Sequence, residues 1–390
     1  YKEPLFWIHL NMDYPFNLKG ILYFPKINTE YDSIEGTIKL YNNQVFIADN
    51  IKEVIPEFLM LLKGVIDCPD LPLNVSRSAL QNDGFVKKIS EYITKKVADK
   101  LIGMCKTDKE AYEKYWDDIS PFIKFGCLKD EKFCDKMSDY ILFKNIDHEY
   151  LTLKDCIAKN GGAEETKAEE EKTEASEGEN TEEKAEEKKV TIYYVTDEQQ
   201  QSQYINMFKQ EGLDAVLLTH NIDSPFVTQL EQRNENVQFQ RIDADLTDTF
   251  KEEVAKEEEE AFKADTETLT DVFRKALEND KLEVKVEKLK NENVASMVTL
   301  SEQSRRMQEM MKMYNMYGMD PSMFGTDVTL VLNANHPLVQ YVLKNKDGEH
   351  VPMFCKQLFD LAMLSNKPLN PEEMTAFINR SNEIMMLLAK

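Results

Sequence analysis

The stretch DLPLNVSRSALQ, Asp70 to Gln81, lies between two segments in which apolar residues recur at helical spacing. Pro72 lacks an amide hydrogen and biases the residue before it away from helix, so the chain is predicted to run extended there. Asn74 and Ser76 carry short polar side chains of the kind that cap helices, and they predict a new turn. The sequence therefore predicts a loop that is fixed at both ends by helices.

Arg77 lies in this loop, where the new turn would begin. Its guanidinium is planar and always charged, and it can hold a phosphate or a carboxylate through two hydrogen bonds. The alternative is an arginine that caps the end of a neighbouring helix. The chemistry of the residue alone favours this alternative, because single arginines in loops are common.

The chain has 390 residues, enough for two or three domains with separate cores. Its net charge of −23 repels nucleic acids and anionic membranes, and no basic stripe with interleaved aromatic residues is present. We therefore exclude nucleic-acid binding. No run of about 18 apolar residues is available to cross a bilayer, so no membrane partner is predicted.

The six cysteines form no CxxC pair and have no histidine at metal-ligand spacing, so no metal site is predicted. The favoured interpretation is reduced, partly buried thiols in a cytoplasmic protein. They are Cys68, Cys105, Cys127, Cys134, Cys156 and Cys355. The first residue is Tyr1 rather than Met, as in an excised piece of a longer protein, so nothing is inferred about a leader.

The first part of the chain predicts a layer of strands covered by helices. Asn42 and Asn43 tolerate the positive φ of a hairpin turn. The predicted strands are 16–24, 37–41 and 44–48, and the predicted helices are 53–66 and 84–104. Helical spacing continues at 112–123, 131–143 and 153–158, and we interpret these apolar stripes as core.

The segment from Gly161 to Lys189 differs in composition from the rest of the chain. It has no aromatic or branched aliphatic residue, and Glu outnumbers Lys by twelve to five between Ala163 and Lys189. Such a segment cannot bury enough apolar surface to offset the entropy of ordering, so we predict a disordered acidic insertion.

A second, smaller α/β unit is predicted after this insertion, with strands at 190–196, 214–219 and 237–242 and helices at 199–211 and 224–232. The first strand-to-helix turn, 196–198, contains no glycine, so it cannot admit a pyrophosphate as a dinucleotide-binding turn does. A long charged helix is predicted at 250–278, and strands at 282–289 and 294–300 follow it.

A methionine-rich helix is predicted at 301–317, and its apolar residues spread over more than one face. One interpretation is ordinary core. We favour binding of many apolar partners, because flexible methionines on an exposed surface suit promiscuous contact. The residues are Met307, Met310, Met311, Met313, Tyr314, Met316 and Tyr317.

The last two predicted helices, Val351 to Ser365 and Pro371 to Leu388, are apolar along their facing sides. The apolar surface of such a helix pair must be buried against another surface. The simplest partner is the same helix pair of a second copy of the chain. The predicted dimer interface contains Phe354, Leu358, Leu361, Phe377, Ile378, Met385 and Leu388.

Long stretches of the sequence, in the same order, resemble the ninety-kilodalton heat-shock chaperones and the bacterial HtpG members in particular. They are EPLFWIH at 3–9, GILYFPK at 20–26, QVFIADN at 44–50, LPLNVSRSALQ at 71–81, VTIYYVTDE at 190–198, SRRMQEMMKMY at 304–314 and LVLNANHPLV at 330–339. The resemblance covers nearly the whole chain.

The resemblance implies that Arg77 reaches the terminal phosphate of ATP, and that Gln81 is the second polar residue of that loop. ATP and Mg would be bound mainly by a separate N-terminal domain that precedes Tyr1. This piece alone is expected to bind no cofactor and to show no ATPase activity. At Ser78 many relatives carry Glu, so any contact made by that acid is in question.

The resemblance also implies a client-binding role for Phe226, although a core phenylalanine after the helix-starting Pro225 is an equal alternative. The fold expected is a multidomain α+β and α/β chain, in which two α/β units joined by helices precede a C-terminal α+β dimerisation domain with a helical bundle. The predicted boundaries are 1–105, 106–160, 161–189, 190–280 and 281–390.

We therefore predict the middle and C-terminal part of an ATP-dependent cytoplasmic chaperone. It would form a homodimer and bind unfolded or partly folded clients, and other chaperones are further candidate partners. The alternative is a non-enzymatic dimeric scaffold that binds fixed partners through the acidic insertion and the methionine-rich helix. Weak binding of several unrelated unfolded proteins would favour the chaperone, and one tight partner would favour the scaffold.

Overall fold

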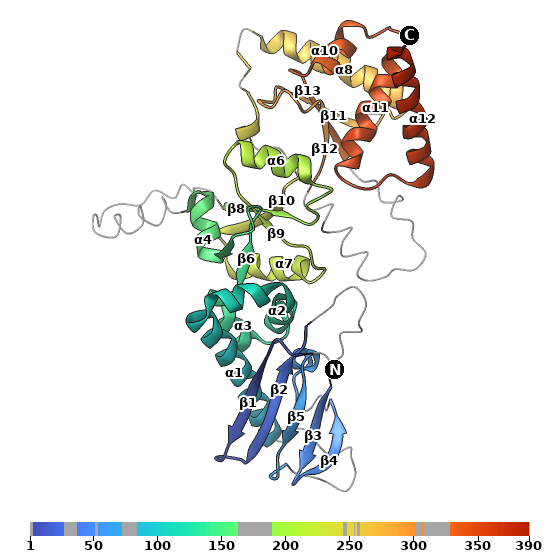
Figure 1. Ribbon diagram of the computed structural model, residues 1–390. Coiled ribbons are helices and arrows are strands. Elements are labelled where there is room, and N and C mark those ends of the chain that lie inside the picture. The colour runs from blue at the N-terminus through green and yellow to red at the C-terminus, as the bar shows by residue number, and fades with distance from the viewer. Residues whose placement is uncertain are drawn as a thin grey trace, which may run out of the picture. The chain divides into compact units, whose positions relative to one another are not determined.

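The computed structural model divides the chain into two compact units, which are treated one at a time. Unit 1 comprises Tyr1–Lys144, His148–Ala158 and His220–Glu235, and unit 2 comprises the remaining segments. The residues that the structure describes are 3–26, 37–50, 54–71, 84–162, 189–244, 248–252, 254–255, 258–301, 306 and 328–389 (Figure 1).

Five strands of unit 1 form one sheet: β1 (Phe6–Met12), β2 (Leu18–Phe24), β3 (Ile38–Asn42), β4 (Val45–Asp49) and β5 (Lys63–Asp67). Their order across the sheet is β1-β2-β5-β3-β4 (Figure 1). Neighbouring strands are antiparallel except β3 and β5, which run parallel. The helices of unit 1 are α1 (Gly84–Thr107), α2 (Lys109–Lys129), α3 (Glu131–Met137), α4 (Leu153–Ile157) and α7 (Asp223–Arg233).

The inner face of this sheet packs against α1 and α2. Strict alternation along β1 buries Phe6 and the residues two and four positions after it, while the residues between them are exposed. The ring of Phe6 lies 6.0 Å from that of Tyr115 on α2, and Phe24 lies 5.0 Å from Phe122 on the same helix. The core of unit 1 is therefore aromatic and lies on one side of the sheet.

One predicted helix in unit 1 is wrong, and a second is too long. The stretch from Glu53 to Ile66 contains a 3₁₀ turn, Glu57–Leu61, and then β5, because its backbone pairs with β2 and β3 at the centre of the sheet. The helix predicted from Glu131 ends at Met137, and after a further 3₁₀ turn, Ser138–Tyr140, the chain enters β6 (Leu142–Lys144). β6 pairs with β7 (Tyr150–Thr152), and this hairpin was not predicted.

The other predicted elements of unit 1 are confirmed to within a few residues. The hairpin of β3 and β4 turns at Asn43 and Gln44, whose φ angles are 49° and 65°, one residue later than predicted. The apolar stripe of α2 is buried from Tyr112 to Ile123. The first strand, β1, was not predicted as a strand.

Unit 2 contains two sheets. The first is parallel, with the order β10-β8-β9, and contains β8 (Val190–Val195), β9 (Ala215–Leu217) and β10 (Val237–Arg241). The second, with the order β11-β13-β12, contains β11 (Glu283–Glu287), β12 (Ser296–Leu300) and β13 (Val328–Asn333). The helices are α6 (Ser202–Gln210), α8 (Glu259–Leu277), α10 (Pro337–Lys344), α11 (Val351–Leu364) and α12 (Pro371–Leu388).

The two sheets of unit 2 share a hydrophobic cluster that joins Phe208 of α6 to Val331 of β13. The hydroxyl of Tyr204 on α6 donates a hydrogen bond to the carbonyl oxygen of Val298 on β12, at 2.8 Å. Most predicted elements here are confirmed, including both ends of α12. The predicted helix 250–278 begins only at Glu259, because Phe250 belongs to a 3₁₀ turn, Asp248–Phe250, and to the shared cluster.

At the coarse level, the prediction of a mixed chain with several α/β parts is confirmed. Most of the predicted acidic insertion, 161–189, and of the predicted methionine-rich helix, 301–317, lies outside the described residues, namely 163–188, 302–305 and 307–317. The predicted domain boundaries remain predictions.

Candidate functional site

The loop that contains Arg77 and Gln81 leaves the sheet at the end of β5. Its residues 72–83 lie outside the described ones, but the chain that leads into it is firmly held. The Asn42 side-chain amide donates to the carbonyl oxygens of Cys68, Pro69 and Leu71, at 3.1, 3.1 and 3.3 Å. The Asp70 carboxylate accepts from the backbone of Asn17 at 2.7 Å. The entry to the loop is thus tied to the central strands.

The chain that leads out of the loop is fixed to the same part of the sheet. Helix α1 begins at Gly84, and the ring of its second residue, Phe85, lies 5.4 Å from that of Phe16. Phe16 is the neighbour of Asn17, which binds Asp70 at the loop entry. The chain on both sides of residues 72–83 is therefore anchored beside the β1–β2 connection.

Phe226 lies in the core of unit 1. It has no exposed surface, and its ring faces the ammonium of Lys124 at 5.7 Å. Lys124 on α2 forms a buried ion pair with Asp223, the first residue of α7. The second Asp223 oxygen accepts from the backbone of His220 at 2.9 Å. In this structure Phe226 is a core residue that helps to hold α7 on α2, and we do not include it in a client surface.

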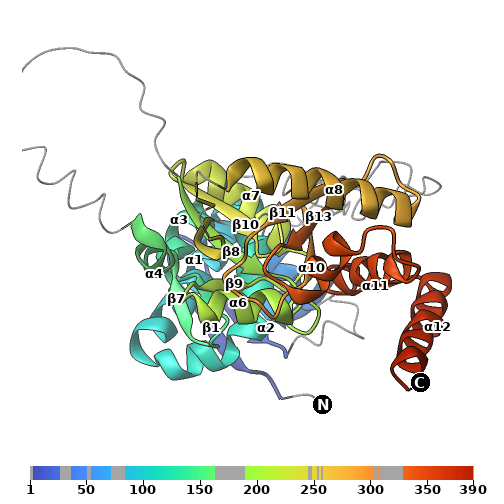
Figure 2. The ribbon, with the colours of Figure 1, turned by 90° about the horizontal axis from the view of Figure 1, so that it is seen from above.

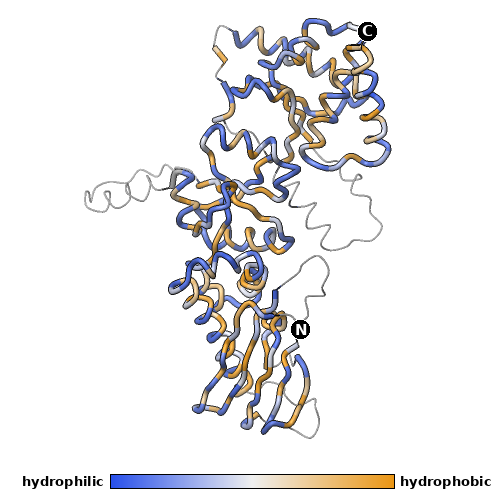
Figure 3. Tube along the Cα trace, in the orientation of Figure 1, coloured by the Kyte–Doolittle hydropathy of each residue, from blue (hydrophilic) through white to orange (hydrophobic). Residues whose placement is uncertain are grey.

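The end of α12 carries an exposed apolar surface. Ile378 is 50% exposed, Met385 58% and Leu388 84%, and among its described residues α12 buries none (Figure 3 shows its last turns as hydrophobic). On α11, Leu361 is 46% exposed, whereas Phe354 is half-buried and Leu358 is buried in the core of unit 2. Leu358 is therefore a core residue that packs beneath this surface, and it is not part of the exposed surface itself.

The position of α12 on α11 is set by polar contacts and by its start. The Arg380 guanidinium binds the Asp360 carboxylate at 2.7 Å, and the Gln357 amide donates to the Ser381 hydroxyl at 3.0 Å. Asn370 and Glu373 form a reciprocal capping box at the first turn. In Figure 2, α12 extends beyond the end of α11 and apart from α8. Among the described residues, the main contacts of α12 are therefore with α11.

A buried ion pair lies under the connection between α11 and α12. Asn366 donates to the Asp243 carboxylate at 3.2 Å, and Arg241 lies 2.9 Å from the same carboxylate. Burial raises the pKa of Asp243, and the charge of Arg241 opposes this shift. Next to it, the Ser365 hydroxyl donates to Gln203 on α6 at 2.9 Å. These contacts connect the α11–α12 turn to the parallel sheet.

The cysteines are unpaired, and five of the six are buried. Burial raises the pKa of Cys68 to about 11 and that of Cys355 to about 12, so both are neutral thiols at physiological pH. Within the described ranges, no group of three or more His, Cys, Asp or Glu side chains could hold a metal ion. No described helix is both long and apolar enough to span a bilayer.

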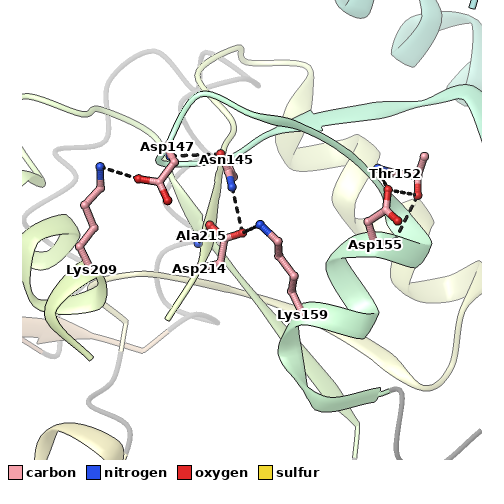
Figure 4. A network of polar contacts seen from close by, with 8 residues as sticks. All are labelled: Asn145, Asp147, Thr152, Asp155, Lys159, Lys209, Asp214 and Ala215. Carbon is pink, nitrogen blue, oxygen red and sulfur yellow. Dashed lines mark hydrogen bonds and ion pairs between the residues drawn. The ribbon is translucent and has the colours of Figure 1, made fainter. Parts of the chain in front are cut away.

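The two ends of the acidic segment are attached to the parallel sheet of unit 2. Figure 4 shows Lys159, at the entry to the segment, bound to Asp214 at 3.3 Å, where the amide of Asn145 also donates at 3.1 Å. Asp214 directly precedes β9, and β8, which follows the segment, pairs with β9. The chain therefore leaves from and returns to the same sheet.

We expect the acidic segment to be dispensable for folding. Replacing residues 163–188 by a short Gly–Ser linker should change the melting temperature by less than about 2 °C, because the segment offers no apolar side chains to a core. Calorimetry of both proteins tests this. Lys159→Ala serves as a comparison that removes one anchor and keeps the segment. A fall of many degrees on deletion would show that the segment packs against the folded units.

Comparison with known proteins identifies the relatives of this chain. The family model described as "Hsp90 protein" matches residues 1–168 and 165–390. A Porphyromonas gingivalis (strain ATCC 33277) "Chaperone protein HtpG" is 39% identical over 375 residues, which are 94% of this chain and 51% of that protein. A Bacteroides fragilis (strain YCH46) "Chaperone protein htpG" is 38% identical over 357 residues, 89% of this chain and 48% of that protein.

A more distant HtpG chaperone, from Buchnera aphidicola subsp. Cinara cedri, is 26% identical over 395 residues, 99% of this chain and 58% of that protein. The chain thus spans about half the length of the curated relatives it matches.

Proposed function

Because this chain belongs to the Hsp90 protein family, we propose that it is the middle and C-terminal part of an ATP-dependent molecular chaperone. In the complete protein, ATP and Mg would be bound mainly by a separate N-terminal domain. This part would supply Arg77 and Gln81 to the nucleotide, bind unfolded or partly folded clients, and form a cytoplasmic homodimer. The observation that carries the proposal is the family match along the whole length of the chain.

Features of the described residues support two parts of this proposal. The chain is anchored on both sides of the predicted Arg77 loop, at Asp70 and at Phe85. A side chain that must reach into another domain needs such rigid support. The exposed apolar end of α12 has the character of a surface that a second copy would cover.

The chaperone function is tested with this chain and a model enzyme that aggregates on heating. An excess of the chain should reduce light scattering by the unfolding enzyme, and serum albumin at equal concentration is the control. Scattering equal to that with albumin would contradict client binding. Protection of several unrelated enzymes would also argue against a scaffold with one fixed partner.

The methionine-rich segment is expected to carry part of this protection. Replacing Met310, Met311 and Tyr314 with serine or asparagine should weaken protection about tenfold or more, because a fully buried apolar side chain contributes about 1.5 to 3 kcal/mol. The dimer and the melting temperature should be unchanged. A control replaces the exposed Leu338 of α10 with serine. If melting shows a collapsed domain instead, these side chains belong to the core.

A further inference from the structure

Two of the six cysteines lie against each other in unit 1. Cys127 is near the end of α2 and Cys134 is in α3, and a single residue, Asp130, separates the two helices. A hydrogen bond links the two side chains, and both are buried. Both are free thiols in this structure. The turn at Asp130 thus brings two reduced thiols into contact.

The turn itself fixes the backbone around this thiol pair. The backbone N–H of Asp130 donates to the carbonyl oxygen of Gly126 at 2.8 Å, and the carbonyl oxygen of Asp130 accepts from the N–H of Cys134 at 2.9 Å. A Cβ atom at position 126 would lie 2.6 Å from the ring of Phe133, so a glycine is needed where α3 packs on α2. The pair is therefore held by the backbone on both sides of the turn.

Two polar side chains of α7 lie over the thiol pair. The Gln229 amide donates to the carbonyl oxygen of Cys127 at 2.9 Å, and the Cys134 thiol, when protonated, donates to the Gln229 oxygen at 4.0 Å. Arg233, one turn further along α7, forms an ion pair with Asp135, the neighbour of Cys134. Gln229 is half-buried and Arg233 is exposed. Rotation of these two side chains would admit a molecule as small as hydrogen peroxide.

The surroundings make the two thiols unequal. The hydrogen bond from Cys127 and the charge of Arg233 lower the pKa of Cys134, whereas burial and two acids of α3 oppose this shift. The same hydrogen bond, burial and a third acid raise the pKa of Cys127. The three acids are Asp135, Glu131 and Asp130. Cys134 is thus the thiol that ionises, and Cys127 stays protonated beside it.

We propose that Cys127 and Cys134 form a redox site, at which a peroxide oxidises the two thiols to an intramolecular disulfide. A thiolate beside a second cysteine that can resolve it is the arrangement of redox-sensing sites. This inference goes beyond the proposed chaperone function and does not depend on it.

The reaction has two steps. The Cys134 thiolate attacks one oxygen of hydrogen peroxide, the O–O bond breaks, and a sulfenic acid and hydroxide are formed. The Cys127 sulfur then attacks the Cys134 sulfur, and the sulfenic hydroxyl leaves as water with the proton of Cys127. The hydroxide takes the proton that Cys134 released when it ionised. Two thiols and one peroxide therefore give one disulfide and two water molecules.

Peptide mapping without reduction tests the site in the chain of residues 1–390. The chain is treated with a small excess of hydrogen peroxide at pH 7, denatured, alkylated with iodoacetamide and cut with trypsin. Cleavage after lysine separates peptide 125–129, which contains Cys127, from peptide 133–136, which contains Cys134. We expect these two peptides to be joined by a disulfide, and dithiothreitol to release them.

Cys105 provides an internal comparison. It is half-buried, whereas the other five cysteines are buried, and burial raises its pKa. Exposure alone predicts that Cys105 is oxidised first. The thiol pair predicts that Cys134 is oxidised about fivefold faster than Cys105 at pH 7, because more of it is thiolate. Faster oxidation of Cys105, or sulfinic acids at Cys127 and Cys134 without the joined peptides, would overturn the proposal.

Variants of Arg233 test the role of its charge. Arg233→Gln should slow disulfide formation about threefold at pH 7 and move the midpoint of its pH dependence upward, because the thiolate loses a nearby cation. Arg233→Lys keeps the charge and should restore the rate and the midpoint. Calorimetry of both variants shows whether loss of the ion pair with Asp135 affects folding.

A serine variant tests whether the two thiols react together. Cys134→Ser should protect Cys127 from oxidation, because Cys127 then has no sulfenic acid to attack. Cys156→Ser, at another buried cysteine of unit 1, is the matched control and should still give the joined peptides. If Cys127 is oxidised as fast in Cys134→Ser as in the parent chain, the two thiols act independently and the proposal is wrong.

Discussion

The chain of residues 1–390 is expected to be a dimer, and a variant that ends before Pro371, and therefore lacks α12, is expected to be a monomer. Helix α12 contacts α11 on one side and leaves Ile378, Met385 and Leu388 at least half exposed. Each such side chain contributes about 1.5 to 3 kcal/mol when it is fully buried. The loss of translational and rotational freedom on association opposes dimer formation by roughly 4 to 15 kcal/mol. Because the two contributions are of similar size, removal of several of these side chains should abolish the dimer.

Sedimentation equilibrium at micromolar concentration measures this mass directly. Because truncation could expose the core of unit 2, a full-length variant with Ile378→Asp and Met385→Asp provides a second test. Glu383→Ala, on the same helix and also exposed, is the matched control and should remain a dimer. If both the truncated chain and the double variant remain dimeric, the interface lies elsewhere.

In the complete protein, with its nucleotide-binding domain, Arg77→Ala is expected to reduce ATP turnover roughly one hundred- to one thousand-fold. The loss of one charge-assisted contact to developing charge costs about 2 to 4 kcal/mol in the transition state. Nucleotide affinity should change little if, as we propose, a separate domain binds the nucleotide. The rigid attachment of the loop at Asp70 and Phe85 makes a compensating movement of the chain costly.

Steady-state turnover and nucleotide titration separate these two effects. Arg77→Lys retains the charge but loses the planar fork, so it should recover only part of the rate. Lys88→Ala, an exposed substitution on α1, should turn over ATP like the parent. Wild-type turnover in Arg77→Ala would assign this arginine to helix capping. The chain of residues 1–390 should show no ATPase activity alone, and robust turnover would contradict the proposal that another domain binds the nucleotide.

The sequence predicts elements best where local signals agree with each other. Both ends of α12 were predicted from its apolar spacing, and at its start Pro371 and the capping box of Asn370 and Glu373 agree with that pattern. β5 was mistaken for the end of a helix because the buried apolar residues before it recur at helical spacing; they are Val54, Ile55, Phe58, Leu59 and Leu62. Only pairing with β2 and β3 reveals the strand, and that pairing is a long-range property.

β1 shows a different limit of sequence reasoning. A half-buried strand is recognised in a sequence by apolar residues that alternate with polar ones. The buried residues of β1 follow this pattern, but the exposed residue Trp7 is apolar and interrupts it. The same ambiguity affects the site residues, because Phe226 and Met385 are both apolar residues on helices. Burial under α2 makes the first a core residue, whereas the second is exposed.

The ion pair of Lys124 and Asp223 has a consequence for synthesis on the ribosome. Its two residues are 99 positions apart, and the acidic segment and most of a parallel sheet are translated between them. The ribosome adds roughly 5 to 20 residues per second, so Asp223 is synthesised about 5 to 20 seconds after Lys124. The ammonium of Lys124 has no Asp223 carboxylate to pair with during this interval. During that interval the face of α2 that α7 will cover is open to solvent in the nascent chain. This chaperone-family protein thus has an interval in its own synthesis when it resembles a client.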